Sequence, residues 1–196
     1  MTTIGSLQRL SAPALSKLIL AEQEASAAAA AAAAASTAEN DSPTSLAIID
    51  VRDDDYIGGH IKGSQNVPSH KLDVMLPTLV RQLQDKETVV FHCALSQQRG
   101  PSAALRYIRE RERLMPKEVG TKLTSTADGA AVEEVAEEVA KEAEGEGKTD
   151  EKKKQPVNQK VFVLDRGFVG WQEAFGLDER LTEGYSKELW RDGYWM

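Results

Sequence analysis

The sequence predicts an α/β domain built around a parallel β-sheet. Apolar runs without polar alternation, typical of strands buried on both faces, occur at 46–51, 89–93 and 160–164. Segments with apolar residues at helical spacing alternate with these runs. The 196 residues suffice for one compact domain with additional segments, so we predict a single domain over 1–196.

The composition limits which classes of binding partner and which cellular compartment we expect for this protein. The net charge is −7 and no basic stripe is present, which argues against a nucleic-acid partner. No apolar run approaches the length of a membrane span, and the N-terminus lacks a cationic region followed by an apolar core. A single cysteine cannot form an internal disulfide, so we expect a reducing compartment, cytoplasmic or nuclear, and no membrane association.

Residues 1–24 predict a short strand and then an amphipathic helix. Ser11 is a good N-cap, Pro13 falls in the first turn, and apolar residues follow at helical spacing. The helix can continue into the unbroken alanine run at 27–35, since alanine is the best helix former. That run has no large side chains, so we interpret 25–45 as an Ala-rich linker insertion without chemistry.

The strand predicted at 46–51 is followed by charged residues. Asp50 and Arg52 are interpreted as a structural pair that fixes the loops above the strand end, although Asp50 is also a possible general acid. The run Asp53-Asp54-Asp55 is interpreted as a solvated helix N-terminus, with cation binding as the alternative.

A turn-rich stretch at 58–68 comes next. Gly58 and Gly59 mark backbone positions that need unusual dihedrals, and His60 is expected to be fixed by hydrogen bonds in a structural turn rather than to act in catalysis. A helical stripe of apolar residues between 72 and 83 then leads to the next strand.

The stretch from 89 to 101 carries the predicted chemistry. A strand delivers Cys93 to a loop that reaches Arg99 five residues later, and Gly100-Pro101 opens a helical pattern. Loop amides and a helix N-terminus favour an anion and stabilise a thiolate nucleophile, and a guanidinium is suited to a tetrahedral oxyanion. The alternative is a small buried core cysteine. We interpret the stretch as an oxyanion loop.

The segments that follow differ in character. Residues 115–158 have no large aromatic side chain and are rich in glutamate, which predicts an acidic, disordered insertion. The apolar pattern resumes with a strand at 160–164, a turn at 165–168 and a closing helix. The aromatic C-terminal tail at 181–196 is expected to cover the core, with partner recognition as the alternative.

Together these motifs resemble the rhodanese-like domain. The resemblance is carried by 48–52, 56–68, the His92-Cys93 loop to Pro101, and 163–168, and it covers residues 4–24, 46–114 and 160–180. It implies a five-stranded parallel sheet with helices on both faces. Its active loop would sit at the carboxyl end of a central strand.

Loop length separates the chemistries of that family. Its sulfurtransferases have a loop shorter by one residue, whereas the spacing from Cys93 to Arg99 is similar to that of the cell division cycle twenty-five dual-specificity phosphatases and their small arsenate-reducing relatives. The resemblance therefore implies a phosphatase with Cys93 as nucleophile and Arg99 as oxyanion ligand. The amides of the oxyanion loop would assist: Ala94, Leu95, Ser96, Gln97 and Gln98. Substrates would be phosphotyrosine in proteins or small phosphomonoesters, with no metal or cofactor.

Three points stay open at this stage. The larger mitotic phosphatases have a glutamate at the position of Gln98, and tyrosine phosphatases have Ser or Thr at the position of Gly100, so the general acid is not identified. An arsenate reductase would need glutathione or glutaredoxin, because the chain has no second cysteine. A sulfurtransferase and a non-catalytic module that binds a phosphorylated partner are the remaining alternatives.

Overall fold

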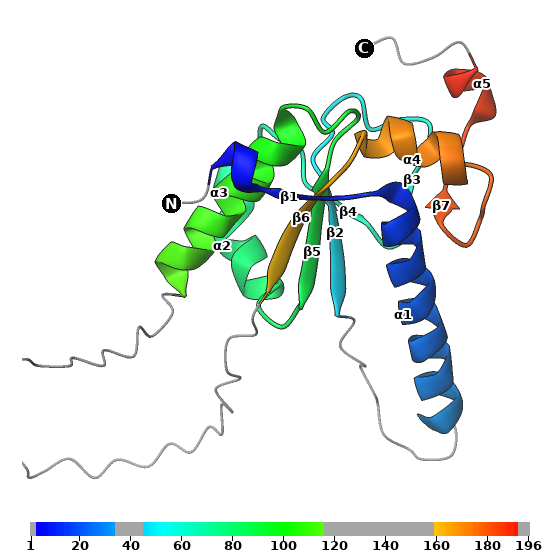
Figure 1. Cartoon of the computed structure of the whole chain (residues 1–196), viewed down its shortest axis with the longest axis horizontal. Helices are drawn as coiled ribbons and strands as arrows, with labels where there is room; N and C mark the ends of the chain where they lie inside the picture. Colours follow the sequence, from blue (N-terminus) through cyan, green and yellow to red (C-terminus); the bar gives the residue numbers. More distant parts are fainter. Residues whose placement is uncertain (1–2, 34–44, 116–158, 192–196) are drawn as a thin grey trace, which may run out of the picture. The chain divides into compact units, whose positions relative to one another are not determined.

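The computed structural model describes residues 3–33, 45–115 and 159–191, which belong to one compact unit. A parallel five-stranded sheet with order β1-β6-β5-β2-β4 forms its centre (Figure 1). Its strands are β1 (Gln8–Leu10), β2 (Leu46–Asp50), β4 (Gln65–Asn66), β5 (Thr88–His92) and β6 (Lys160–Leu164). The predicted five-stranded parallel sheet is confirmed.

The parallel register brings the carboxyl ends of the strands, where the candidate site residues lie, to one edge of the sheet. Asp50 at the end of β2 pairs with His92 at the end of β5, directly before Cys93. Asn66 at the end of β4 lies on the other side of Asp50. Because connections from parallel strands leave at their carboxyl ends, the loops after β2, β5 and β6 gather at this edge.

Helices cover both faces of the sheet, as predicted (Figure 1). One face carries α2 (Leu72–Gln82) and α3 (Arg99–Leu114), and the other carries α1 (Ala12–Ala33) and α4 (Gly167–Phe175). Ser11 caps α1, since its Oγ accepts a hydrogen bond from the Ala14 amide at 3.4 Å. None of the helices in the described ranges has the length and apolar character that a membrane span needs.

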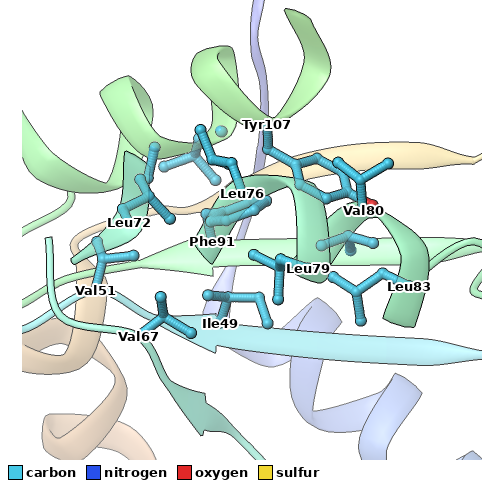
Figure 2. Close-up of a cluster of buried hydrophobic side chains, with 14 of the residues drawn as sticks. Ile49, Val51, Val67, Leu72, Leu76, Leu79, Val80, Leu83, Phe91 and Tyr107 are labelled. Atoms are coloured by element: carbon cyan, nitrogen blue, oxygen red, sulfur yellow. The ribbon is translucent and has the colours of Figure 1, made fainter. Parts of the chain in front are cut away.

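The face under α2 and α3 forms a dense apolar core (Figure 2). The predicted stripe of α2 supplies Leu72, Leu76, Leu79 and Val80, all buried. Tyr107 of α3 lies against Phe91 of β5, with ring centroids 5.3 Å apart. This core fixes α3, whose first residue follows the Cys93 loop.

The C-terminal part of the described chain packs back on the domain. β7 (Thr182–Glu183) pairs antiparallel with β3 (His60–Ile61). The sequence did not reveal this two-stranded pairing. α5 (Lys187–Trp190) places Trp190 edge-on to Phe168, and the Trp190 indole N–H donates to the Gly58 carbonyl at 2.8 Å. The expectation that the tail covers the core is therefore confirmed up to residue 191.

Two predicted insertions fall mostly outside the described residues. α1 includes the first part of the proposed 25–45 linker and ends at Ala33, while 34–44 are not described. Nearly all of the proposed 115–158 insertion, from residue 116 on, also lies outside the described ranges, as do the final residues 192–196. Both insertions stay predictions.

Candidate active site

The loop from Cys93 to Gln98 connects β5 to α3 and curls around the cysteine sulfur. Cys93 is 4% exposed, and its Sγ accepts a hydrogen bond from the Ser96 amide at 3.2 Å. Ser96 is completely buried, has a left-handed φ of 52°, and accepts a 3.4 Å hydrogen bond at Oγ from the Cys93 amide. This left-handed residue turns the chain back over the thiol.

Helix α4 holds the outside of this loop. The Phe168 and Val169 amides donate to the carbonyls of Cys93 and Ala94, each at 2.9 Å. These donors belong to the first turn of α4, whose N–H groups have no partner within their own helix. Gly167 allows the approach, because a Cβ there would lie only 2.4 Å from the Cys93 carbonyl oxygen.

These outward carbonyls set the direction of the loop amides. In a trans peptide the N–H points opposite to the carbonyl that precedes it. The amides of Ala94 and Leu95 therefore point away from α4. The Ser96 carbonyl accepts a 3.5 Å hydrogen bond from Arg9, so the Gln97 amide points away from Arg9.

The loop consequently presents unpaired donors. Among the described residues, the amides of Ala94, Leu95, Gln97 and Gln98 have no hydrogen-bond acceptor. Helix α3 starts directly after them at Arg99, and its dipole adds positive potential at this end. A strand end, a curled loop of free amides and a helix N-terminus together make an arrangement that can bind an anion. The anion site expected from the sequence stays a prediction.

Arg99 is held by two carboxylates. Its Nη1 donates to Asp53 at 3.1 Å and to Asp55 at 2.7 Å, and its Nη2 donates to the second oxygen of Asp55. The hydrogen bonds that Arg99 donates to Asp55 are the main cause that raises the pKa of Arg99 above its usual range, and the hydrogen bond that it donates to Asp53 raises it further. Cys93 and Arg99 lie near enough to interact electrostatically, and the guanidinium itself is held by the turn after β2.

The interpretation of the aspartate run as a solvated helix start is wrong. Residues 53–56 form a turn, closed by the Tyr56 amide on the Asp53 carbonyl at 3.1 Å. Burial opposes ionisation of Asp53, but hydrogen bonds from Ser69, His70 and Arg99 outweigh it and hold its pKa well below the usual range. The local sequence gives no signal for the contact with Arg99, which lies more than forty residues away.

Asp50 occupies the structural position that the sequence favoured. It is completely buried, and its carboxylate accepts hydrogen bonds from the Arg52 amide at 3.0 Å and from Nε at 2.8 Å. The Arg52 guanidinium also donates to the carbonyls of Ile57 and Gly59, and it lies over the Phe168 ring at 4.2 Å. This arrangement ties the loop after β2 to α4 and leaves Asp50 facing Arg52 instead of the anion loop.

The contacts of His92 and His60 fit structural roles for both histidines. Burial lowers the pKa of His92, which favours its neutral form, and its Nε2 has no hydrogen-bond partner among the described residues. A neutral imidazole adds no positive charge beside Cys93. His60 lies in β3 and contacts Glu183 at 3.2 Å, which agrees with the structural role expected for it.

The fold and the loop together describe an α/β protein in which a cysteine-centred loop with free amides lies at the carboxyl edge of a parallel sheet. Comparison with protein families matches residues 28–129 to the rhodanese-like domain. The chain belongs to the rhodanese-like family, as the sequence motifs implied.

Three curated relatives illustrate the similarity. The chain is 33% identical over 131 residues to the Arabidopsis thaliana "Dual specificity phosphatase Cdc25", a match that covers 66% of this chain and 64% of the relative. It is 30% identical to the Saccharomyces cerevisiae "CDC25-like phosphatase YCH1", covering 74% and 77%. It is 34% identical to the rice "Arsenate reductase 2.1", covering 65% and 56%. The chain thus spans less than two thirds of the Arabidopsis and rice proteins.

A solved structure supports the same fold. The yeast protein Ygr203w, described as a protein tyrosine phosphatase of the rhodanese family, aligns with a TM-score of 0.58 and 26% identity. The alignment covers 97% of this chain and all of that one.

Proposed function

We propose that this protein is a cysteine-dependent phosphatase that hydrolyses phosphotyrosine or other phosphomonoesters through a phosphocysteine intermediate. The observation that carries the proposal is the loop after β5, in which the Ser96 amide donates to the Cys93 sulfur and four further amides have no acceptor among the described residues. Arg99 follows this loop at the start of α3. The relatives make a cysteine-based phosphatase or reductase of the rhodanese family the broader class to which this activity belongs.

In the first step the Cys93 thiolate attacks phosphorus in line with the ester oxygen. The S–P bond forms, the P–O bond to the leaving group breaks, and that oxygen departs with the electron pair. The free amides of Ala94, Leu95, Gln97 and Gln98 would bind the non-bridging oxygens, and Arg99 would supply the permanent positive charge. Water then attacks phosphorus, breaks the S–P bond and releases inorganic phosphate.

Protonation of the leaving group restricts the substrates. Gln98 cannot donate a catalytic proton, and Asp50 is buried against Arg52. We therefore expect turnover of aryl phosphates, whose leaving groups depart without a strong acid, and low rates with alkyl phosphates. A phosphotyrosine side chain is the aryl phosphate found in proteins, so a phosphorylated protein is the proposed macromolecular partner.

Arsenate reduction is the second candidate, favoured by the similarity to the rice arsenate reductase. Here the thiolate would displace water from arsenate to form an S–As(V) bond. An external thiol, glutathione or glutaredoxin, would then attack the Cys93 sulfur, and the S–As electron pair would reduce arsenic to As(III). The resulting mixed disulfide needs a further thiol for its reduction, because Cys93 is the only cysteine of the chain.

Three assays on the purified full chain separate the candidates: hydrolysis of p-nitrophenyl phosphate, glutathione-dependent arsenate reduction, and sulfur transfer from thiosulfate to cyanide. We expect hydrolysis that Cys93→Ser abolishes while the melting temperature is kept. Activity only with arsenate would establish the second candidate, and activity only with thiosulfate would establish a sulfurtransferase. Inactivity in all three would favour a module that binds a phosphorylated partner.

A further inference from the structure

The hydrogen bonds of Arg99 leave one particular edge of its guanidinium unoccupied. A guanidinium carries five N–H donors: one on Nε, two on Nη1 and two on Nη2. Asp55 and Asp53 together accept from both donors of Nη1, and Asp55 also accepts from one donor of Nη2. Among the described residues, no acceptor is found for Nε or for the second N–H of Nη2.

The two remaining N–H groups lie side by side. Nε and Nη2 share one edge of the planar group, and their outer N–H bonds run nearly parallel. Such an edge binds two oxygens of a phosphate at once. The two aspartates therefore accept from Nη1 and from one N–H of Nη2, which an oxyanion bound in this mode does not use. The N–H of Nε and the second N–H of Nη2, which such an oxyanion does use, stay available.

We propose that Asp55, supported by Asp53, is a positioning residue that orients Arg99 so that its Nε–Nη2 edge is presented to the substrate oxyanion. This inference rests on the proposed function, in which Arg99 binds the phosphate. Asp55 acts through Arg99 and is not assigned a contact with the substrate.

The carboxylates are themselves anchored, as a positioning role requires. The Asp55 side chain is 8% exposed and accepts a hydrogen bond from the Asp53 amide at 2.9 Å. Asp53 in turn accepts hydrogen bonds from Ser69 Oγ at 2.6 Å and from His70 Nδ1 at 2.9 Å, just before α2 begins. Arg99 is thus held against a fixed support before any substrate arrives, which lowers the entropy lost on binding.

If charge were the only effect of these carboxylates, removing one would strengthen phosphate binding, whereas a positioning role predicts weaker binding. Each carboxylate beside the loop repels an anion, so removing one negative charge should tighten phosphate binding. Asp54 offers a matched control, because it is exposed and makes no hydrogen bond or ion pair with the residues that the structure describes. Asp54→Asn and Asp55→Asn remove the same charge from the same turn, but only the second disturbs Arg99.

The test measures binding of inorganic phosphate by isothermal titration calorimetry, together with kcat/KM for p-nitrophenyl phosphate, on the full chain. We expect Asp54→Asn to leave the phosphate Kd unchanged or slightly lower. Asp55→Asn should raise it by about tenfold, the loss expected when a charged hydrogen-bonding group is misplaced. Asp53→Asn, which keeps the two contacts from Asp55 to Arg99, should fall between them and serves if Asp55→Asn folds poorly by thermal unfolding.

A second comparison separates positioning from general damage to the loop. In an Arg99→Ala background, Asp55→Asn should cause no further weakening of phosphate binding, whereas damage to the loop would weaken it in both backgrounds. The inference is overturned if Asp55→Asn binds phosphate as tightly as Asp54→Asn while the wild type binds and turns over substrate. If the wild type neither binds phosphate nor hydrolyses p-nitrophenyl phosphate, the proposed function fails as well.

Discussion

Replacing Gly167 with alanine tests the contact between α4 and the cysteine loop. The added Cβ would lie 2.4 Å from the Cys93 carbonyl oxygen and 2.5 Å from that of Ala94, so backbone must move. Gly167 also has a φ of 56°, in the left-handed region that disfavours alanine. The substitution therefore combines conformational strain with a collision against the loop that surrounds the sulfur.

The expected loss can be divided with a matched control. Left-handed backbone costs alanine roughly 1–2 kcal/mol, and forced overpacking costs about 1–3 kcal/mol more. Gly63 has a φ of 74°, but no atom lies within 4 Å of the place that an added Cβ would take, so Gly63→Ala should show the strain alone. We expect Gly167→Ala to unfold at a lower temperature than Gly63→Ala, by roughly 2–4 °C for each kcal/mol of collision.

Activity should separate the two variants more clearly than stability. Because a shift of about 1 Å in a catalytic group costs on the order of 100-fold in rate, Gly167→Ala should lose about that much kcat/KM for p-nitrophenyl phosphate. Gly63→Ala should stay close to the wild type. Equal melting temperatures and equal kcat/KM in the two variants would refute the reasoning that α4 positions the loop.

Three further predictions concern buried or paired groups. Asp50→Asn leaves Arg52 buried without its charge partner and should reduce the free energy of unfolding in urea by about 3–5 kcal/mol, whereas a loss confined to alkyl phosphate turnover would indicate a general acid. Burial raises the pKa of Tyr107 to about 12 from an ordinary value of 10.0. The free energy of unfolding that the neutral phenol contributes is complete below pH 10, and about 2–3 kcal/mol of it is lost between pH 10 and 12. Urea unfolding across this pH range measures the loss. Tyr107→Phe should remove this pH dependence, and the same dependence of unfolding free energy on pH in Tyr107→Phe would contradict the prediction. Arg99→Lys should lower kcat/KM on the order of 100-fold, because an ammonium lacks the planar fork, and wild-type kinetics would show that the guanidinium is not used.

The parts of the fold that could be predicted depend on local patterns. The strands around Ile48, Phe91 and Val163 are continuous apolar runs, and the stripe of α2 has a clear helical period. The position of Cys93 between a strand and a helix also follows from local sequence, since Gly100 and Pro101 mark the start of α3. These signals were enough to predict the fold class and to place Cys93 and Arg99 at the two ends of the loop between β5 and α3. The roles of the two residues stay predictions.

The remaining features depend on contacts between distant residues. Asp53 and Asp55 look like any acidic turn until the fold brings them to Arg99. The contact of α4 with the loop depends on the left-handed backbone of Gly167, and one glycine after a strand does not reveal which backbone approaches it. β7 has only two residues, too few for a periodic pattern.

The central claim is that the Cys93 sulfur becomes covalently bonded to phosphorus during turnover. Acid quenching of the full chain during p-nitrophenyl phosphate hydrolysis, followed by peptide mass spectrometry, measures this directly. We expect one added phosphoryl group on the peptide that contains Cys93, absent from Cys93→Ser. Sustained hydrolysis without this adduct, or hydrolysis by Cys93→Ser at the wild-type rate, would contradict the claim.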